Sequence, residues 1–240
     1  MKKILNKTKI ADFATYIGVV IAFIVMNALM NEGLLTRSMK GQLVPICCYI
    51  VMAVSLNLTV GILGELSLGH AGFMSVGAFT GVVTAMSLQS AIPSDGVRLA
   101  LAIVMGAIFA GIAGTLVGIP VLRLHGDYLA IVTLAFGEII KELINCLIIG
   151  HDENGLHIIF NATGAKTVTD LGLTETGKVL IKGAQGATGT DTIASFTAGF
   201  ILIMVTLVVV LNLARSRSGR AIMALRDNRI AAESVGINVT

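Results

Sequence analysis

Long apolar runs dominate this chain and predict that it crosses a membrane several times. Leu99–Leu122 contains no Asp, Glu, Lys or Arg, and neither does Ala194–Ala214. About 20 helical residues, at a rise of about 1.5 Å each, span the roughly 30 Å hydrocarbon core of a bilayer. The apolar pattern therefore predicts six spans, which lie near residues 13–30, 43–62, 70–88, 99–122, 128–149 and 194–214.

Two segments outside these spans differ in composition. Residues 150–191 are polar and rich in Gly and Thr, which predicts a small folded excursion or hairpin with too little apolar content for a core of its own. Residues 215–240 follow the last span and are basic and rich in Ala. Residues 1–214 then form one transmembrane domain, and the predicted fold class is an all-α polytopic membrane protein.

Overall composition agrees with this fold class. The chain is 55% hydrophobic and 13% charged, with a mean hydropathy of +0.89, whereas soluble domains carry about 25% charged residues. Its 27 glycines favour close contacts between helices, and Gly77–Gly81 and Gly114–Gly118 both match the small-residue contact pattern. Cys47, Cys48 and Cys146 lie in apolar runs and are predicted to be buried small side chains.

The distribution of basic residues predicts the orientation. With the N-terminus in the cytoplasm, ten basic residues lie inside and six outside, and three of the six lie in the 150–191 loop, where the positive-inside rule is weaker. The inside set is Lys2, Lys3, Lys7, Lys9, Arg123, Arg215, Arg217, Arg220, Arg226 and Arg229. The run Phe13–Met30 is long and no small-residue cleavage site follows it, so we predict an uncleaved first span rather than a signal peptide.

The apolar pattern breaks between the second and third spans, near residues 61–72. The interrupting residues are Gly61, Gly64, Glu65, Ser67, Gly69, His70 and Gly72. Irregular backbone at membrane depth survives only where it is buried in protein or lines a wet cavity, and ionisable residues there usually face an interior pathway. The segment is therefore either a broken helix that lines a translocation route or an ordinary cytoplasmic turn with Glu65 and His70 in water.

A charged cluster interrupts the fifth span. Glu138, Lys141 and Glu142 lie within about one helical turn. They could line a pore, or Lys141 and Glu142 could pair with a neighbouring subunit. We favour structural pairing.

The last segment is predicted to be a short amphipathic helix. Ile222 and Leu225 share a helix face, Arg and Glu flank it, and Gly236 is placed to cap its end. One interpretation is a basic stop-transfer flank that touches anionic headgroups. The other is a docking helix for a cytoplasmic partner, which we favour because stop-transfer alone would not require the Ala/Glu/Gly tail after Arg229.

Three stretches occur together and in order. Ser55–Gly81 contains S-L-G-H-A-G-F, Gly126–Glu138 contains Y-L-A-I-V-T-L, and Gly219–Thr240 contains G-R-A-I-M-A-L-R-D-N and ends in G-I-N-V-T. In this combination the chain resembles the permease subunits of ATP-binding-cassette importers for branched-chain amino acids, of the LivM type. The resemblance runs from about residue 43 to the end and is weak across residues 150–191.

The resemblance implies a pore-forming subunit of an importer in the bacterial cytoplasmic membrane. Its expected partners are a second, related permease, two cytoplasmic ATPase subunits, an extracytoplasmic solute-binding protein and the lipid bilayer, with no nucleic acid and no cofactor. The candidate pathway residues are Glu65, Ser67, Gly69, His70, Gly72 and Glu138. The candidate residues for coupling to the ATPase, within a helix expected over Gly219–Gly236, are Gly219, Arg220, Leu225, Arg226, Asp227 and Gly236. The chain has no G-x-x-x-x-G-K-[ST] phosphate loop, so the ATPase is expected in separate subunits.

Two departures from the family pattern affect this expectation. The stretch G-x-x-G-L-x-G has two rival matches, His151–Leu156 and Lys182–Gly189, so no ligand role is transferred to either. The chain stops at Thr240, where members of the family usually continue into further spans, so we expect a truncated chain.

The substrates expected for the importer are leucine, isoleucine and valine, or a related small solute such as urea or amides. Function classes other than this importer are less well supported. An ion-coupled secondary transporter with Glu65 or Glu138 at its coupling site is the alternative, since broken helices occur there too. An enzyme is not expected, because the chain shows no catalytic constellation. No metal site is expected either, since the four histidines His70, His125, His151 and His157 lack metal-ligand spacing.

Overall fold

The computed structural model describes residues 2–89, 91–121, 124, 126–152, 155–161, 168–174 and 177–237. The chain divides into two compact units, one formed by Met1–Gly64 with Ala194–Thr240 and the other by Glu65–Ile193. Each unit is described by itself. Arg123, His125 and Lys166, together with the final N-V-T of the sequence, lie outside the described residues.

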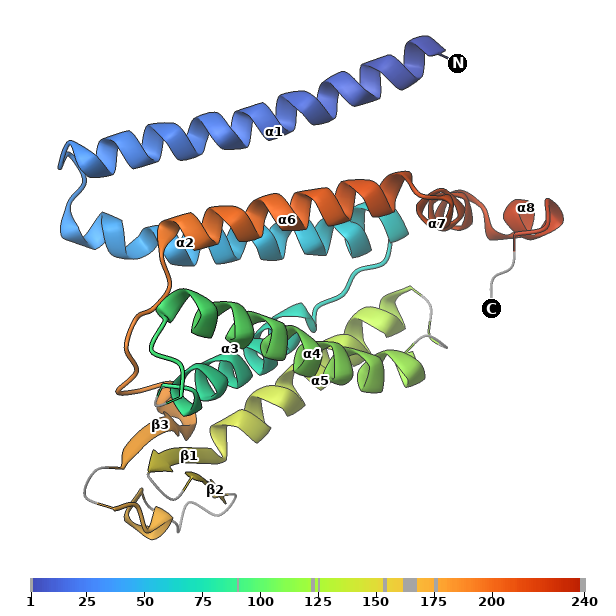
Figure 1. The fold of residues 1–240 in the computed structure, drawn as a ribbon. Helices are drawn as coiled ribbons and strands as arrows, with labels where there is room; N and C mark the ends of the chain where they lie inside the picture. The colour runs from blue at the N-terminus through green and yellow to red at the C-terminus, as the bar shows by residue number, and fades with distance from the viewer. Residues whose placement is uncertain are drawn as a thin grey trace. The chain divides into compact units, whose positions relative to one another are not determined.

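Long apolar helices build the first unit. They are α1 (Lys2–Asn31), α2 (Arg37–Asn57), which continues into the π-helical turn η1 (Leu58–Leu63), and α6 (Phe196–Arg215). Helices α2 and α6 lie side by side (Figure 1). Cys47 of α2 packs with Ile203 and Leu207 of α6. Gly199 makes this approach possible, since a Cβ there would lie 2.8 Å from the Cβ of Cys47.

Two short helices end the first unit. They are α7 (Arg217–Asp227) and α8 (Arg229–Ser234). Ser216 caps α7 by accepting a hydrogen bond from the Gly219 N–H at 3.0 Å, and Asn228 caps α8 by accepting one from the Ala231 N–H at 3.0 Å. Asn228 has extended backbone angles, so the single amphipathic helix predicted for this segment is wrong in one respect: it is two helices. Gly236 has φ +85, which confirms its predicted role at the end of the last helix.

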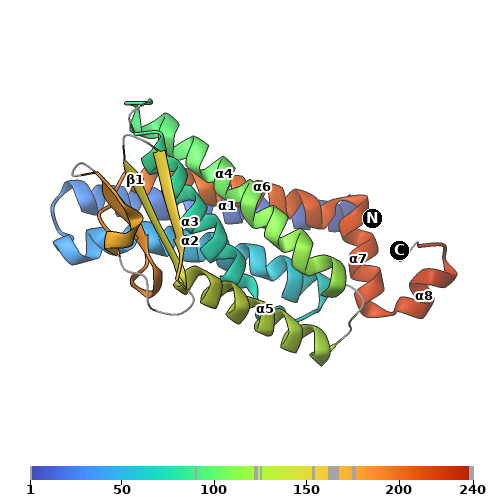
Figure 2. The ribbon, with the colours of Figure 1, turned by 90° about the horizontal axis from the view of Figure 1, so that it is seen from below.

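The second unit combines three helices with a small sheet. The helices are α3 (His70–Ser87), α4 (Asp95–Val121) and α5 (Asp127–Asn145). Helices α3 and α4 pack closely (Figure 2), because Gly77 meets Gly106 and Gly81 meets Ala102 at backbone distance. The small-residue pattern at Gly77–Gly81 is thus a helix contact, as predicted. Around Gly114 and Gly118, by contrast, no described atom lies within reach of an added Cβ.

The sheet contains β1 (Leu147–Asp152), β2 (Gly155–Phe160) and β3 (Lys178–Lys182) in the order β2-β1-β3, with both pairs antiparallel. The short 3-10 turns η2 (Val168–Leu171) and η3 (Gly183–Gln185) flank it. Leu180 and Ile181 are 1% and 0% exposed and form one cluster with Ile149 and with Met86 of α3. The loop is therefore a folded excursion, as predicted, and its core is shared with α3.

Among the residues that the structure describes, four helices are long and apolar enough to cross a membrane. They are Phe13–Asn31, Arg37–Leu63, Asp95–Val121 and Phe196–Arg215. Helices α3 and α5 occupy the predicted third and fifth spans but are shorter, and α5 carries Glu138, Lys141 and Glu142. The arrangement with six crossings, and its orientation, stay predictions.

Two predicted details were wrong. The fifth span was expected to reach Ile149, but α5 ends at Asn145 and residues 147–149 belong to β1. Their apolar character continues that of the helix, so composition alone gave no sign of the change. The cysteines were all expected to be buried, yet only Cys47 is, whereas Cys48 is exposed and Cys146 is half-buried.

Candidate functional site

The predicted helix break near residues 61–72 is present. Helix α2 widens into the π-helical turn η1, and the N–H of Gly64 donates to the carbonyl oxygen of Thr59. Gly64 has φ +80, a left-handed conformation that glycine adopts without strain. Residues 65–69 are non-helical, and α3 begins at His70. Single π-turns are rare and occur frequently at functional sites.

Within the second unit, the start of α3 lies directly against α5. The N–H of Leu68 donates to the hydroxyl oxygen of Thr133 at 3.2 Å. A Cβ at Gly69 would collide with the carbonyl oxygen of Thr133, and one at Gly72 would lie 3.0 Å from the Cα of Gly137. Both glycines are buried. The backbone at Gly69 and Gly72 therefore makes a close contact with α5.

A cavity of about 290 Å³ lies between α3, α5 and η3. Of the six candidate pathway residues, Gly72 and Glu138 line it. Ser75, Lys141 and Asn145 add polar atoms to its wall, and Leu68, Phe79 and Ile144 are among the apolar side chains that line it. Glu65, Ser67 and His70 are half-buried and do not line this cavity.

The charged cluster on α5 forms an ion pair along the helix. The Lys141 ammonium lies 2.9 Å from a carboxylate oxygen of Glu138, and both side chains are more than half exposed in this chain. Lys141 therefore has its partner on its own helix, and pairing with a neighbouring subunit stays a prediction. Exposed pairs of this kind contribute little to stability, so their position beside the cavity is their more informative property.

Two of the candidate coupling residues, Gly219 and Arg220, lie at the corner between α6 and α7. Gly219 is buried there, because a Cβ would collide with the carbonyl oxygens of Leu213 and Ala214. Arg220 turns back and donates to the carbonyl oxygen of Arg215 at 2.6 Å. Leu225 is half-buried and Asp227 is exposed. Gly236 lies beyond α8 at the far end of the segment.

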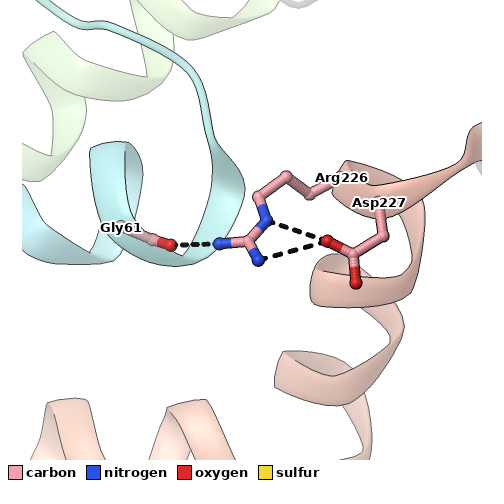
Figure 3. A network of polar contacts seen from close by, with 3 residues as sticks. All are labelled: Gly61, Arg226 and Asp227. Carbon is pink, nitrogen blue, oxygen red and sulfur yellow. Dashed lines mark hydrogen bonds and ion pairs between the residues drawn. The ribbon is translucent and has the colours of Figure 1, made fainter.

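Arg226 links α7 to the helix break. Its guanidinium donates to the carbonyl oxygen of Gly61 at 2.5 Å, and it also donates to Oδ1 of Asp227 at 3.1 and 3.3 Å (Figure 3). A small apolar cavity of about 100 Å³ lies beside this link, between η1, α6 and α7. Two features that were predicted separately, the break and the C-terminal helix, thus meet in one network.

Sequence reasoning missed several residues of these sites. Thr133, which accepts from Leu68, and Ile222, which lines the small cavity, were present in the quoted motifs without an assigned role. Gly61 was named as a break and not as a hydrogen-bond acceptor. The backbone carbonyl that Arg226 binds carries no sequence signature, so no pattern could have found it.

Comparison with known proteins identifies the family of this chain. A family model described as "Branched-chain amino acid transport system / permease component" matches residues 38–240. The chain belongs to this family. Two relatives named high-affinity branched-chain amino acid transport system permease protein LivM support this: the Escherichia coli K12 protein is 33% identical over 200 residues and the Salmonella typhimurium LT2 protein is 33% identical over 202. No solved structure matches the chain.

The matches to the LivM proteins cover most of this chain but less than half of each relative. The alignments cover 79% and 80% of this chain but 44% of each LivM protein, so the chain spans less than half the length of the curated relatives. Membership of the branched-chain amino acid permease family, together with four described helices that are long and apolar enough to cross a membrane, indicates a multi-pass membrane protein. The predicted resemblance is confirmed.

Proposed function

We propose that this chain forms part of the translocation pathway of an ATP-driven importer in the bacterial cytoplasmic membrane, with its N-terminus in the cytoplasm. The substrates are branched-chain amino acids (leucine, isoleucine and valine) or a related small solute such as urea or an amide. The partners are a second permease, two cytoplasmic ATPase subunits and an extracytoplasmic solute-binding protein. Membership of the branched-chain amino acid permease family supports this proposal.

The observation that carries the proposal is the hydrogen bond from Arg226 to the carbonyl oxygen of Gly61. A coupling helix must transmit movement of the ATPase to the helices that line the pathway. Helix α7 follows α6 after a single residue, Ser216, and its last turn is bonded to the π-helical end of α2. An ATPase that moves α7 would therefore pull on the end of α2, immediately before the break.

The pathway itself would include the segment from Glu65 to Gly72 and the α3–α5 cavity that Gly72 and Glu138 line. Ionisable groups at membrane depth are costly unless they face an interior pathway or a protein partner. A cavity wall that is apolar apart from a few polar groups also suits a small solute with an apolar side chain. These features support the assignment of Glu65, Ser67, Gly69, His70, Gly72 and Glu138 to the route.

The coupling assignment is tested by charge reversal. Leu225→Glu and Arg226→Glu should abolish co-purification of the ATPase, or its stimulation, while the chain still inserts in the membrane. Lys40→Glu is a matched control, because Lys40 lies near the start of α2, at the opposite end from η1. Unchanged ATPase association and stimulation in the α7 variants would remove the docking role. Solute uptake by a chain that recovers no ATPase would favour an ion-coupled secondary transporter instead.

The pathway assignment is tested by replacing Gly72 with a larger residue. Gly72→Leu should block uptake by the assembled importer while leaving subunit association intact, because α5 backbone lies 3.0 Å from the position of the new Cβ. Gly118→Leu is the control, since no described atom lies within 4 Å of a Cβ there. Normal uptake in the Gly72 variant would return Ser67–Phe73 to the interpretation as a simple turn.

A further inference from the structure

An apolar stripe runs along one face of strand β2. Leu156, Ile158 and Phe160 are 45%, 62% and 49% exposed, while the alternate residues of the strand are half-buried. Successive side chains of a strand point to opposite faces of the sheet, so these three share one face. Contiguous apolar surface of this kind marks a contact with a partner or a membrane.

The stripe continues the surface by which the sheet packs on α3. Ile158 lies directly opposite Ile149, which lies opposite Ile181, and Phe160 lies opposite Leu147. Residues that are directly opposite in an antiparallel pair point to the same face. Because Ile149 and Ile181 are buried with Met86 of α3, the stripe points to the side of the sheet where that helix lies. Strand β2 is at the sheet edge, next to β1 and not to β3 (Figure 1).

The opposite face of the sheet carries the apolar pair Ile148 and Ile159 together with Asp152 and His157, and the chain itself buries Ile148 and Asp152. Asp152 accepts from the N–H of Thr174 at 3.4 Å and lies 3.2 Å from the imidazole of His157. Leu173 fills the space above Gly150. One face of the sheet therefore contains buried hydrogen bonds. The other face packs on α3 at Ile149 and Ile181 and is exposed and apolar along β2.

The sheet lies at the end of α3 that leads into α4. It packs on the last turns of α3, through Val82, Val83 and Met86. Helix α4, which is long and apolar enough to cross a membrane, starts soon after α3 ends. The first turn of α4 carries the ion pair between Asp95 and Arg98, at 2.8 Å. A charged first turn on an otherwise apolar span places its start at the membrane–water interface, and the sheet lies at that end.

We propose that the stripe Leu156, Ile158 and Phe160 lies in the membrane interface and is covered by the headgroup and upper acyl region of the lipid. Family membership and the long apolar helices indicate a chain surrounded by a bilayer, and the stripe is continuous with the face of the sheet that packs on α3. If the stripe faced water, its three apolar side chains would stay exposed to solvent.

The chain contains no Trp, so the fluorescence of a single introduced Trp is not mixed with that of another Trp in the chain. Ile158→Trp places one indole in the stripe. Lys182→Trp is the matched control: Lys182 is exposed and opposite Ile148, so it lies on the other face of the sheet. The full chain, with any subunits that co-purify, is reconstituted into phosphatidylcholine vesicles brominated either near the top or near the end of the acyl chains. Emission of the unsubstituted preparation is subtracted.

The expected result is a blue-shifted emission for Ile158→Trp with a roughly twofold loss under shallow bromination, less under deep bromination, as for side chains that lie in the interface plane. The Lys182→Trp control should respond to aqueous iodide and not to bromine. Quenching of Ile158→Trp by iodide alone would put the stripe in water and overturn the proposal. A blue-shifted emission that neither agent quenches would overturn it in favour of a subunit contact. Phe160→Trp repeats the measurement if Ile158→Trp does not insert.

Discussion

Replacing Gly69 by Ala tests whether the α3–α5 contact depends on a bare backbone. Gly69 has φ −84 and ψ 2, angles that alanine adopts without difficulty, so any cost comes from the space around the new methyl group. That methyl group would collide with the carbonyl oxygen of Thr133 and lie 3.1 Å from its carbonyl carbon. Both are backbone atoms in the middle of α5 and cannot turn aside as a flexible side chain would.

The magnitude follows from what must move. Forcing an extra methyl group into a filled contact costs about 1–3 kcal/mol. If α3 and α5 separate, the hydrogen bond from the Leu68 N–H to Thr133, at 3.2 Å, also weakens, which costs about 1 kcal/mol more. For a chain of this size each kcal/mol lowers the midpoint of thermal unfolding by about 2–4 °C. A loss of about 2–4 kcal/mol therefore predicts a midpoint roughly 4–16 °C lower.

The assay is the fraction of detergent-solubilised chain that survives a short heating step, followed by size-exclusion chromatography. Gly111→Ala and Gly118→Ala are matched controls in α4, because no described atom lies within 4 Å of either added Cβ. Alanine is the better helix former by about 1 kcal/mol, so these variants should keep or slightly raise the midpoint. An equal midpoint for Gly69→Ala and the controls would refute the close backbone contact.

Three further substitutions test other parts of the structure. Ile181→Ala removes a side chain that is 0% exposed, so it should cost about 2–5 kcal/mol, while Lys182→Ala beside it should leave the thermal midpoint within about 0.5 kcal/mol. Asn228→Ala removes the cap of α8, and the loss of about 1 kcal/mol should speed hydrogen exchange in that helix about fivefold. Gly219→Ala should displace α7, because its methyl group would meet the two carbonyl oxygens at the α6–α7 corner, and faster proteolysis there would register the change; an unchanged rate would contradict the contact.

The sequence predicted the elements whose signals are local. A charge-free run of more than twenty residues is sufficient for α4 and α6, and clustered glycines with polar residues were sufficient for the break near Gly64. The cap at Gly236 was also predictable, because only glycine adopts its positive φ readily. Asn228 carried an equally local signal, since Asn is a favoured N-cap residue, but the Ala-rich run on both sides of it concealed the second helix start.

The sheet was harder to predict for a physical reason. Leu147, Ile148 and Ile149 are apolar and follow an apolar helix, so hydropathy continues smoothly while the backbone changes from helix to strand. Their strand conformation comes from pairing with Gly155–Phe160 and, about thirty residues later, with Lys178–Lys182. The β-branched and aromatic residues of Ile158–Phe160 were a local sign of a strand. An apolar strand that directly follows an apolar helix is read from composition as part of that helix.

The same reasoning explains why the candidate site could be predicted only in pieces. The break and the C-terminal helix each have a local signature, but the bond that joins them spans 165 residues. A helix that ends leaves backbone carbonyls without helical partners, and Gly61 has no side chain to shield its carbonyl oxygen. Arginine suits that acceptor because its planar guanidinium serves a carbonyl oxygen and the carboxylate of Asp227 at once, which a lysine ammonium cannot do with the same geometry. The identity of residue 226 is therefore explained by the break at the end of α2, and not by the amphipathic pattern of α7 in which it was first noticed.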